Sequence, residues 1–347
     1  MNAVHLRGSV EFALHPRGVV CCGAARPPAQ SARYRVARCA RSAVFSGVIM
    51  ADGQEDDPRE GGFAEARGGP TVLRILVGAQ LRRLREASGI SREDAAYAIR
   101  GSEAKMSRIE SGRVGFKPRD VADLLTMYGL TEGSARDVVL SLAEQANEPG
   151  WWHRYSDTMP DWFSTYVGLE QAATIIRTYE AQYVPGLLQT EAYANAVVNL
   201  GEAVRADEVS KRVELRMHRQ QLLDVPKPPD YWAVIDEAVL RRSLGGRQVM
   251  RDQLDHILEA TTRQHITVQV VPFDRSDVAA VGGPFTLLRF AEPDLPDIVY
   301  LEQLNSALYL NRNVEVMNYL QIMNRLAAGA LTPQRSTELI TSVRDAL

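Results

Sequence analysis

Apolar residues recur at helical spacing between residues 72 and 146, in five successive groups. Short polar stretches that contain glycine or proline separate the groups, and such stretches end helices. Each group forms one apolar stripe, which an isolated helix cannot bury by itself. The spacing therefore predicts a small domain of five packed helices over residues 72–147.

The pattern changes after Glu148, Pro149 and Gly150. Helical spacing continues over residues 169–200, with a break at Pro185 and Gly186, and returns at 208–223. β-branched and aromatic runs predict strands at 231–235, 266–273, 285–290 and 298–302, with helices at 248–263, 313–328 and 332–346. The last three strands follow one another through short loops, so we expect antiparallel neighbours. The predicted fold class is α+β, an N-terminal all-α domain followed by a larger α+β domain with an antiparallel sheet over residues 148–347.

Residues 1–70 show neither helical nor strand periodicity. The first 49 residues carry seven arginines and one acidic residue, Glu11. One interpretation is a targeting segment, although the short apolar run lies in the wrong place for a secretory signal. The other interpretation is that translation begins at Met50. Because the polar, glycine-rich stretch that follows cannot bury enough apolar surface, we predict a disordered N-terminal extension over residues 1–70.

Charge is divided sharply along the 347 residues. Residues 72–119 hold eleven Lys or Arg against five Asp or Glu, whereas residues 120–347 hold twenty against thirty-one. A basic unit next to an acidic one is typical of a protein that binds a polyanion through one part only. Cys21, Cys22 and Cys39 all precede Met50, and no apolar run approaches the roughly 20 residues that span a bilayer. We therefore expect a cytoplasmic protein that does not enter the membrane.

Residues 90–112 have the pattern of two short helices joined by a tight turn. Ser91 can cap the first helix through the amide of Asp94, and Ser102 can cap the second. Met106 and Ile109 lie three apart on one face of the second helix, which leaves its opposite face polar. Small residues in the first helix allow a close crossing, as in a helix-turn-helix.

The stretch from Arg85 to Gly112 resembles the XRE, or phage-repressor-like, family of helix-turn-helix proteins. The residues that carry the likeness are Ser91, Ala96, Ile99, Ser102, Met106, Ser107, Ile109, Glu110 and Gly112. The resemblance implies that Arg85 and Glu110 form a structural pair. The family usually has glycine where this chain has Arg100. Either Arg100 adopts a left-handed conformation, at about 1–2 kcal/mol, or the turn is shifted by one residue.

The resemblance also implies a set of DNA contacts. Ser102, Glu103, Ala104 and Arg108 would face base edges in the major groove. Arg82, Arg92, Lys105 and Lys117 would contact phosphates, which fix the register but carry no sequence information. The alternative for each of these residues is an ordinary solvated surface position. A double-stranded DNA operator is the expected partner, bound by a homodimer because one recognition helix covers few base pairs.

Residues 148–347 resemble the large C-terminal domain, of uncharacterised function, of many actinobacterial regulators. The likeness rests on residues 148–152, 166–173, 183–194, 236–242 and 282–290. We expect this domain to sense a small-molecule effector or a partner. The likeness also implies an alternative function, an antitoxin-like module that neutralises a small partner protein encoded nearby.

Two groups in this domain have two interpretations each. An aromatic group could line a ligand pocket or pack in the core; it comprises Trp151, Trp152, Tyr155, Trp162, Phe163 and Tyr166. Arg241 and Arg242 could hold an anionic effector or the acidic surface of a partner, or they could simply neutralise the acidic segment before them. The six histidines have no metal-ligand spacing, and no nucleophile or phosphate-loop motif occurs. We therefore expect a transcriptional regulator, not an enzyme, with no catalytic residues, metal or cofactor.

Overall fold

The computed structural model describes residues 69–200, 205–275, 283–292 and 295–347. The predictions of a disordered extension and of a start at Met50 concern residues outside this described part. Five helices form the first section of the described chain, and they are α1 (Pro70–Ala87), α2 (Arg92–Ala98), α3 (Glu103–Glu110), α4 (Pro118–Met127) and α5 (Ser134–Gln145).

These five helices share one buried cluster, to which every helix contributes. Met106 and Ile109, which the spacing places on one apolar face, lie in it together with Ala95, Ala96 and Ile99. Pro118 occupies the first turn of α4, where its missing N–H leaves no helical bond unmade. The helix α5 begins at Ser134 with Gly133 at its N-cap, so Thr131, three residues before the helix, does not cap it.

A six-stranded sheet organises the remainder of the described residues. Its strands, in chain order, are β1 (Ile175–Glu180), β2 (Asp230–Asp236), β3 (Ile266–Val271), β4 (Phe285–Arg289), β5 (Ile298–Glu302) and β6 (Ala307–Leu310). The spatial order is β3-β2-β1-β4-β5-β6. The pairs β1–β2 and β2–β3 are parallel, whereas β1–β4, β4–β5 and β5–β6 are antiparallel. The α+β fold class is confirmed, with a mixed sheet.

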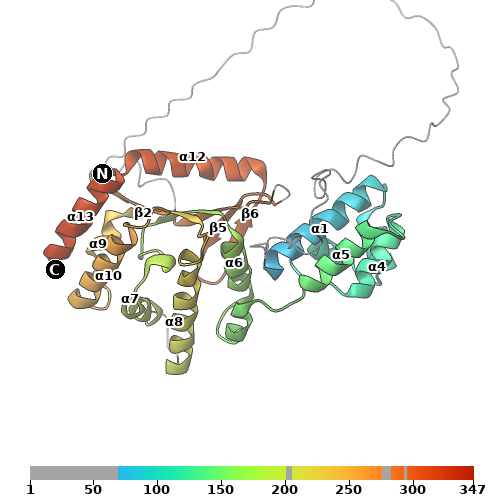
Figure 1. Cartoon of the computed structure of the whole chain (residues 1–347), viewed down its shortest axis with the longest axis horizontal. Helices are drawn as coiled ribbons and strands as arrows, with labels where there is room; N and C mark the ends of the chain where they lie inside the picture. Colours follow the sequence, from blue (N-terminus) through green and yellow to red (C-terminus); the bar gives the residue numbers. More distant parts are fainter. Residues whose placement is uncertain (1–68, 201–204, 276–282, 293–294) are drawn as a thin grey trace, which may run out of the picture. The chain divides into compact units, whose positions relative to one another are not determined.

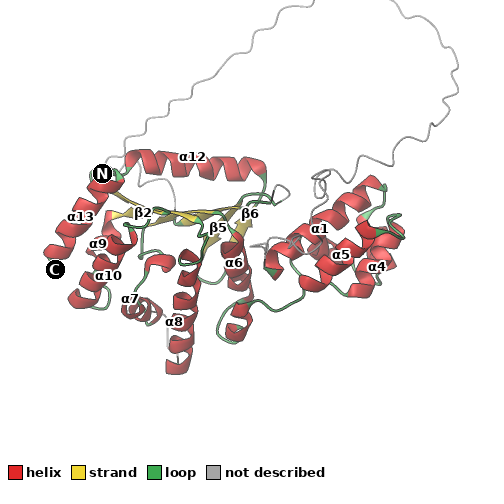
Figure 2. Cartoon of the chain, viewed as in Figure 1, coloured by secondary structure: helices red, strands yellow, loops and turns green. Residues whose placement is uncertain are grey.

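Helices cover both faces of the sheet (Figures 1 and 2). One face, called here the α12 face, packs Tyr179, Phe285 and Val299 against α12 (Asn313–Gly329). The other, called the α8 face, carries Ile176, Tyr231 and the helices listed next. They are α6 (Asp161–Ala172), α7 (Glu191–Val198), α8 (Ala206–Gln220), α9 (Glu237–Arg241), α10 (Arg247–Ala260) and α13 (Pro333–Asp345).

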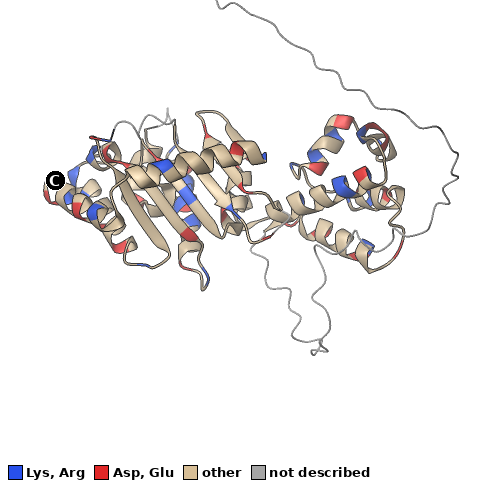
Figure 3. Ribbon diagram, turned by 90° about the horizontal axis from the view of Figure 1, so that it is seen from above, with Lys and Arg blue, Asp and Glu red and all other residues tan. Residues whose placement is uncertain are grey.

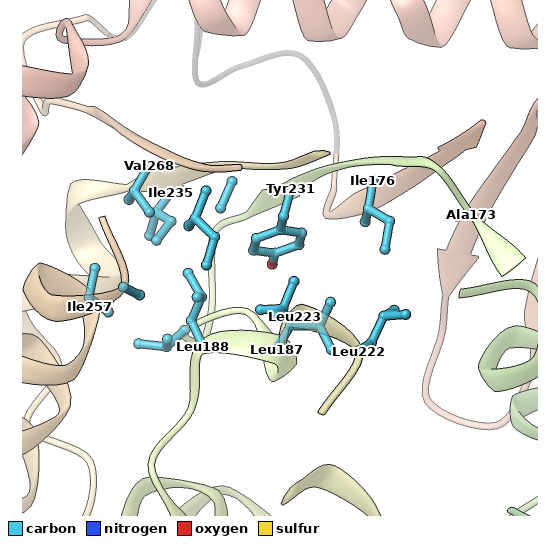
Figure 4. Close-up of a cluster of buried hydrophobic side chains, with 14 of the residues drawn as sticks. Ala173, Ile176, Leu187, Leu188, Leu222, Leu223, Tyr231, Ile235, Ile257 and Val268 are labelled. Atoms are coloured by element: carbon cyan, nitrogen blue, oxygen red, sulfur yellow. The ribbon is translucent and has the colours of Figure 1, made fainter. Parts of the chain in front are cut away.

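Three short 3₁₀ turns complete the described elements: η1 (Trp151–Tyr155), η2 (Gly186–Leu188) and η3 (Gln221–Leu223). Leucines of η2 and η3 meet the α8 face of the sheet. Figure 4 shows Ile176, Tyr231 and Ile235 pointing from the strands toward Leu187 and Leu223. This apolar contact fixes the distance between the sheet and the helices that follow η2 and precede η3.

Three predictions about the sheet are wrong or incomplete. Residues 175–180 were expected to be helical, but they form β1, which lies at the centre of the sheet. The strand at 266–271 was expected to run antiparallel to its successor, but it pairs in parallel with β2 at the opposite edge. The strand β6 was not anticipated. Only long-range pairing determines these positions, because hydrogen bonds across the sheet join segments far apart in the chain.

Candidate nucleic-acid interface

Serine caps position the two helices of the helix-turn-helix. The Ser91 hydroxyl accepts a hydrogen bond from the Asp94 amide at 3.0 Å, and the Ser102 hydroxyl accepts one from the Lys105 amide at 3.1 Å. Both bonds satisfy first-turn amides that have no partner within the helix. These caps confirm the predicted start of each helix.

Close backbone approach to α1 explains two glycines. A Cβ atom at Gly78 would lie 2.5 Å from the Ile109 carbonyl oxygen, so α1 and α3 can cross at this distance only without a side chain there. Gly112 has a φ of 66°, and a Cβ there would lie 2.6 Å from the Ile75 Cα atom. Gly112, two residues after Glu110, therefore serves both a left-handed turn and a tight contact with α1.

A buried ion pair joins α1 to the end of α3. Arg85 Nε lies 2.5 Å from Glu110 Oε1, and Arg85 Nη2 donates to Glu110 Oε2 at 3.2 Å. Arg85 Nη1 also donates to the Ile90 carbonyl at 2.9 Å. The hydrogen bond that Arg85 donates to Glu110 raises the pKa of Arg85, although burial acts in the opposite direction. The arrangement holds α3 against α1 and leaves the opposite face of α3 free.

The turn between α2 and α3 passes through Arg100, whose φ is 50°. The left-handed conformation is therefore the one adopted, and the alternative of a shifted turn does not occur. Gly101 donates its amide to the Ala96 carbonyl at 2.8 Å, which closes the turn. The side chain of Arg100 is exposed beside the start of α3.

The four residues expected to face base edges lie on the exposed side of α3. Ser102, Glu103, Ala104 and Arg108 are all exposed, whereas Met106 and Ile109 are buried on the reverse side. Within the described residues, the Arg108 guanidinium forms no ion pair. The structure therefore brings these side chains to one outward surface of the second helix.

The four expected phosphate contacts differ in their surroundings. Arg82 pairs with Glu86 at 2.8 Å, and Lys105 Nζ lies 2.6 Å from Asp120 Oδ2. Arg92 Nε donates to Glu110 Oε2 at 3.2 Å. Lys117, just before α4, is exposed and has no ion pair in the described part of the chain. Basic and acidic positions are interspersed along these helices (Figure 3).

Three residues near this surface were not named as DNA contacts from the sequence. The cations Arg100 and Arg113 are exposed and, like Arg108, form no ion pair among the described residues. Tyr97 on α2 is 86% exposed. The position of Arg113 directly after Gly112 could have identified it from the sequence, because that position follows the recognition helix.

The aromatic group of the C-terminal part packs internally. Trp152 and Tyr155 are buried in a cluster with Val167, and Trp151 stacks on His218 at 4.0 Å between ring centroids. Core packing is therefore the interpretation that the structure favours for these rings. The arginine pair is also engaged, as Arg241 Nε donates to Glu237 Oε1 at 2.7 Å and Arg242 Nη1 to two carbonyls of residues 181 and 182.

Comparison with known proteins gives two family matches. Residues 76–138 match a helix-turn-helix domain, and residues 163–342 match a domain of unknown function, DUF5753. No curated protein and no solved structure matches the chain. Among the described residues, no helix is long and apolar enough to cross a membrane, and no group of three or more metal-binding side chains occurs.

Proposed function

The chain belongs to the DUF5753 family, and from this together with its helix-turn-helix domain we propose that it is a sequence-specific transcriptional regulator of the XRE type. The helix-turn-helix domain makes it a DNA-binding regulator in general. The observation that carries the finer proposal is the two-sided character of α3. Its apolar side packs on α1 and α2, and its polar side, with Arg108, is exposed. A helix of this kind fits the major groove of B-DNA.

In the proposal, Arg108 binds guanine through two hydrogen bonds and Glu103 accepts one from cytosine. Ser102 and Ala104 complete the contacts with the bases. Lys117 binds a phosphate directly. Arg82, Arg92 and Lys105 each leave the carboxylate with which they pair in the free protein and bind a phosphate instead. Because these carboxylates belong to the same domain, DNA binding requires only side-chain rearrangement.

We further propose a homodimer. The helix α3 has eight residues, so at about 1.5 Å per residue it spans roughly 12 Å and only a few base pairs. Two symmetric copies would double the site and set the spacing of its half-sites at about one turn of DNA. The proposal assigns no catalytic activity to the chain.

Arg108→Ala tests the assignment. Bound genomic fragments supply the operator, and fluorescence anisotropy then compares operator with random duplex at fixed salt. We expect a loss of about 1–3 kcal/mol on the operator and a much smaller loss on random DNA. Lys117→Ala should weaken both equally, because phosphates are the same in every sequence. Equal weakening of both duplexes by Arg108→Ala would show that Arg108 contacts only the backbone.

A second candidate function, an antitoxin-like module for a small partner protein, is favoured by exposed apolar side chains. Leu304, which precedes the edge strand β6, is 93% exposed, and Leu308 within that strand is 54% exposed. Val314 and Met317, at the start of α12, are also exposed. An edge strand with apolar neighbours is a surface that a second protein can bury. Co-purification with the product of the adjacent gene, lost in Leu308→Asp but retained in Arg108→Ala, would support this candidate.

A further inference from the structure

Polar side chains gather at one end of the α8 face of the sheet. The strand register places Thr178 opposite Thr286, and Thr286 opposite Tyr300. The Thr178 and Thr286 hydroxyls are 3.1 Å apart. Side chains alternate between faces, so Glu180 and Glu302 lie on this same face, two residues beyond Thr178 and Tyr300. The Tyr300 hydroxyl donates to Glu302 Oε2 at 2.9 Å.

Helix α8 contributes three arginines to this region, at helical spacing. Arg219 forms a two-bonded pair with Glu170, at 2.8 and 2.7 Å, and Arg212 pairs with Glu208. Arg216 lies between them in the helix and forms neither a hydrogen bond nor an ion pair through its side chain within the described residues. Burial lowers the pKa of Arg216 to about 10, as does the neighbouring Arg219, whereas Glu302 acts in the opposite direction.

Stacked aromatic rings connect α8 to the strands. The Arg219 guanidinium lies 5.3 Å from the centroid of the Tyr166 ring. Tyr166 in turn stacks on Tyr300 at 4.1 Å, and Tyr300 carries the hydroxyl that binds Glu302. This chain of contacts places the arginine stripe of α8 close to Glu302 of β5. Glu180 of β1 lies on the same face of the sheet, near enough for the charge of Glu302 to act on it.

Glu180 is the second group without a partner. Its carboxylate forms no hydrogen bond or ion pair in the described part of the chain, and the side chain is half-buried. Burial raises the pKa of Glu180 to about 8, and the nearby Glu302 adds to the effect. A partly buried polar group without a partner reduces stability, whether it is charged, as Arg216 is, or largely protonated at neutral pH, as Glu180 is, so folding alone does not account for the two side chains. Such groups are typical of ligand sites.

We infer that Glu180, Glu302 and Arg216 form a binding site for a small zwitterion that carries a carboxylate and an ammonium group. The carboxylate pairs with Arg216, and the ammonium group lies between Glu180 and Glu302. The ligand is the effector of the regulator proposed above, and the inference rests on that function only for its biological role.

The charges of the site distinguish a zwitterion from other ligands. A phosphate group would satisfy Arg216 but would be repelled by the Glu302 carboxylate and would leave Glu180 without a cation. A metal ion would need three or more ligating side chains, and the described residues contain no such group. Since Glu180 and Arg216 are half-buried, a small molecule reaches them more readily than a folded partner. The free amino acids are the simplest molecules of this class.

The test is calorimetric titration of the full chain with each of the common free amino acids. For any amino acid that binds, two truncated analogues are then titrated. One lacks the amine and the other lacks the carboxylate. We expect at least one amino acid to bind, and both truncated analogues to bind about tenfold more weakly or worse. Arg216→Gln and Glu180→Gln should each weaken binding by a similar factor, whereas Arg216→Lys retains part of it.

Matched controls are Arg251→Gln and Glu259→Gln, which change exposed residues of α10 and should leave binding unchanged. The melting temperature of the ligand-free chain should not fall in Arg216→Gln, because the variant removes a charge without a partner. A fall would indicate a structural role and overturn the inference. Absence of binding by every amino acid at about 10 mM, or equal binding by the variants and the parent, would also overturn it.

Operator binding by the ligand-free variants separates this inference from the proposed function. Arg216→Gln and Glu180→Gln should bind DNA as the parent does, since neither residue lies in the helix-turn-helix. Amino-acid binding without DNA binding would refute the regulator and leave the site. DNA binding without amino-acid binding would refute the site and leave the regulator.

Discussion

Replacing Glu110 by Gln should destabilise the helix-turn-helix, because the Arg85 guanidinium would then be buried beside a neutral amide. The side chains of Arg85 and Glu110 are only 8% and 3% exposed, so water cannot replace the lost carboxylate. Breaking a buried pair from one side typically destabilises a protein by about 3–5 kcal/mol. Glu86 lies 3.4 Å from Arg85 and remains as a half-exposed partner, which places the expected loss near 3 kcal/mol.

The same reasoning applies from the other side of the pair. Arg85→Met leaves the Glu110 carboxylate with Arg92, 3.2 Å away, as its remaining cation. The double variant Arg85→Met/Glu110→Gln removes both charges together, and well-packed neutral replacements of buried pairs are often close to neutral. We therefore expect the double variant to lose about 2 kcal/mol less than the sum of the two single variants.

Hydrogen exchange measured on peptides of the full chain provides the assay. Peptides from α1 to α3 should lose protection in each single variant, whereas peptides from β2 and β3 serve as the internal control and should not change. Strict additivity of the two single variants would refute the reasoning, because it would show that Arg85 and Glu110 do not depend on each other.

Three further predictions follow from individual residues. Arg100→Gly should raise the free energy of unfolding of the helix-turn-helix, measured in urea, by about 0.5–1 kcal/mol. Glycine removes the strain of the left-handed backbone, and this gain exceeds the conformational entropy that glycine loses on folding. A lower stability would contradict this. Gly78→Ala should lower that stability by about 2 kcal/mol, because the new Cβ would meet the Ile109 carbonyl oxygen; an unchanged denaturation midpoint would show a looser crossing. Glu180 has a folded-state pKa of about 8 against an ordinary 4.5, so the folded chain binds more protons in this window and loses stability as pH rises through it. The free energy of unfolding of Glu180→Gln should therefore match that of the parent at about pH 4 and exceed it increasingly toward pH 8, by about 2 kcal/mol after a discount for solvent. Thermal melting at both pH values measures the difference, and an equal gain at both would refute this origin.

The helix-turn-helix could be predicted from the sequence because its determinants are local. Ser91 and Ser102 cap helices through bonds to residues three positions away, and Met106 and Ile109 mark the buried side by spacing alone. Even the strained position, Arg100, was visible as a departure from glycine. Only the backbone conformation there, and the partners of Arg92 and Lys105, required coordinates.

The sheet was less predictable because its central strand carries a mixed signal. Residues 175–180 read Ile-Ile-Arg-Thr-Tyr-Glu and directly follow the helix α6, so helical spacing extends into them. Their partners in the sheet are residues 230–235 and 285–289, far along the chain. No local pattern encodes a parallel pairing of this separation, and therefore neither the strand order nor β6 at the edge could be deduced.

The proposed DNA-binding surface and the proposed effector site also differ in how far the local sequence predicts them. Arg108 projects from α3 into solvent, so its charge is hydrated and has little effect on the free energy of unfolding. Arg216 belongs to a helix whose sequence has the charged pattern of an exposed surface, and only the fold turns that residue toward Glu302. Its charge is then partly desolvated without a partner. A gain in stability on neutralisation therefore separates the two kinds of site: we expect it for Arg216 and Glu180 but not for Arg108, and a ligand that supplies the missing charges should produce the same gain without any substitution.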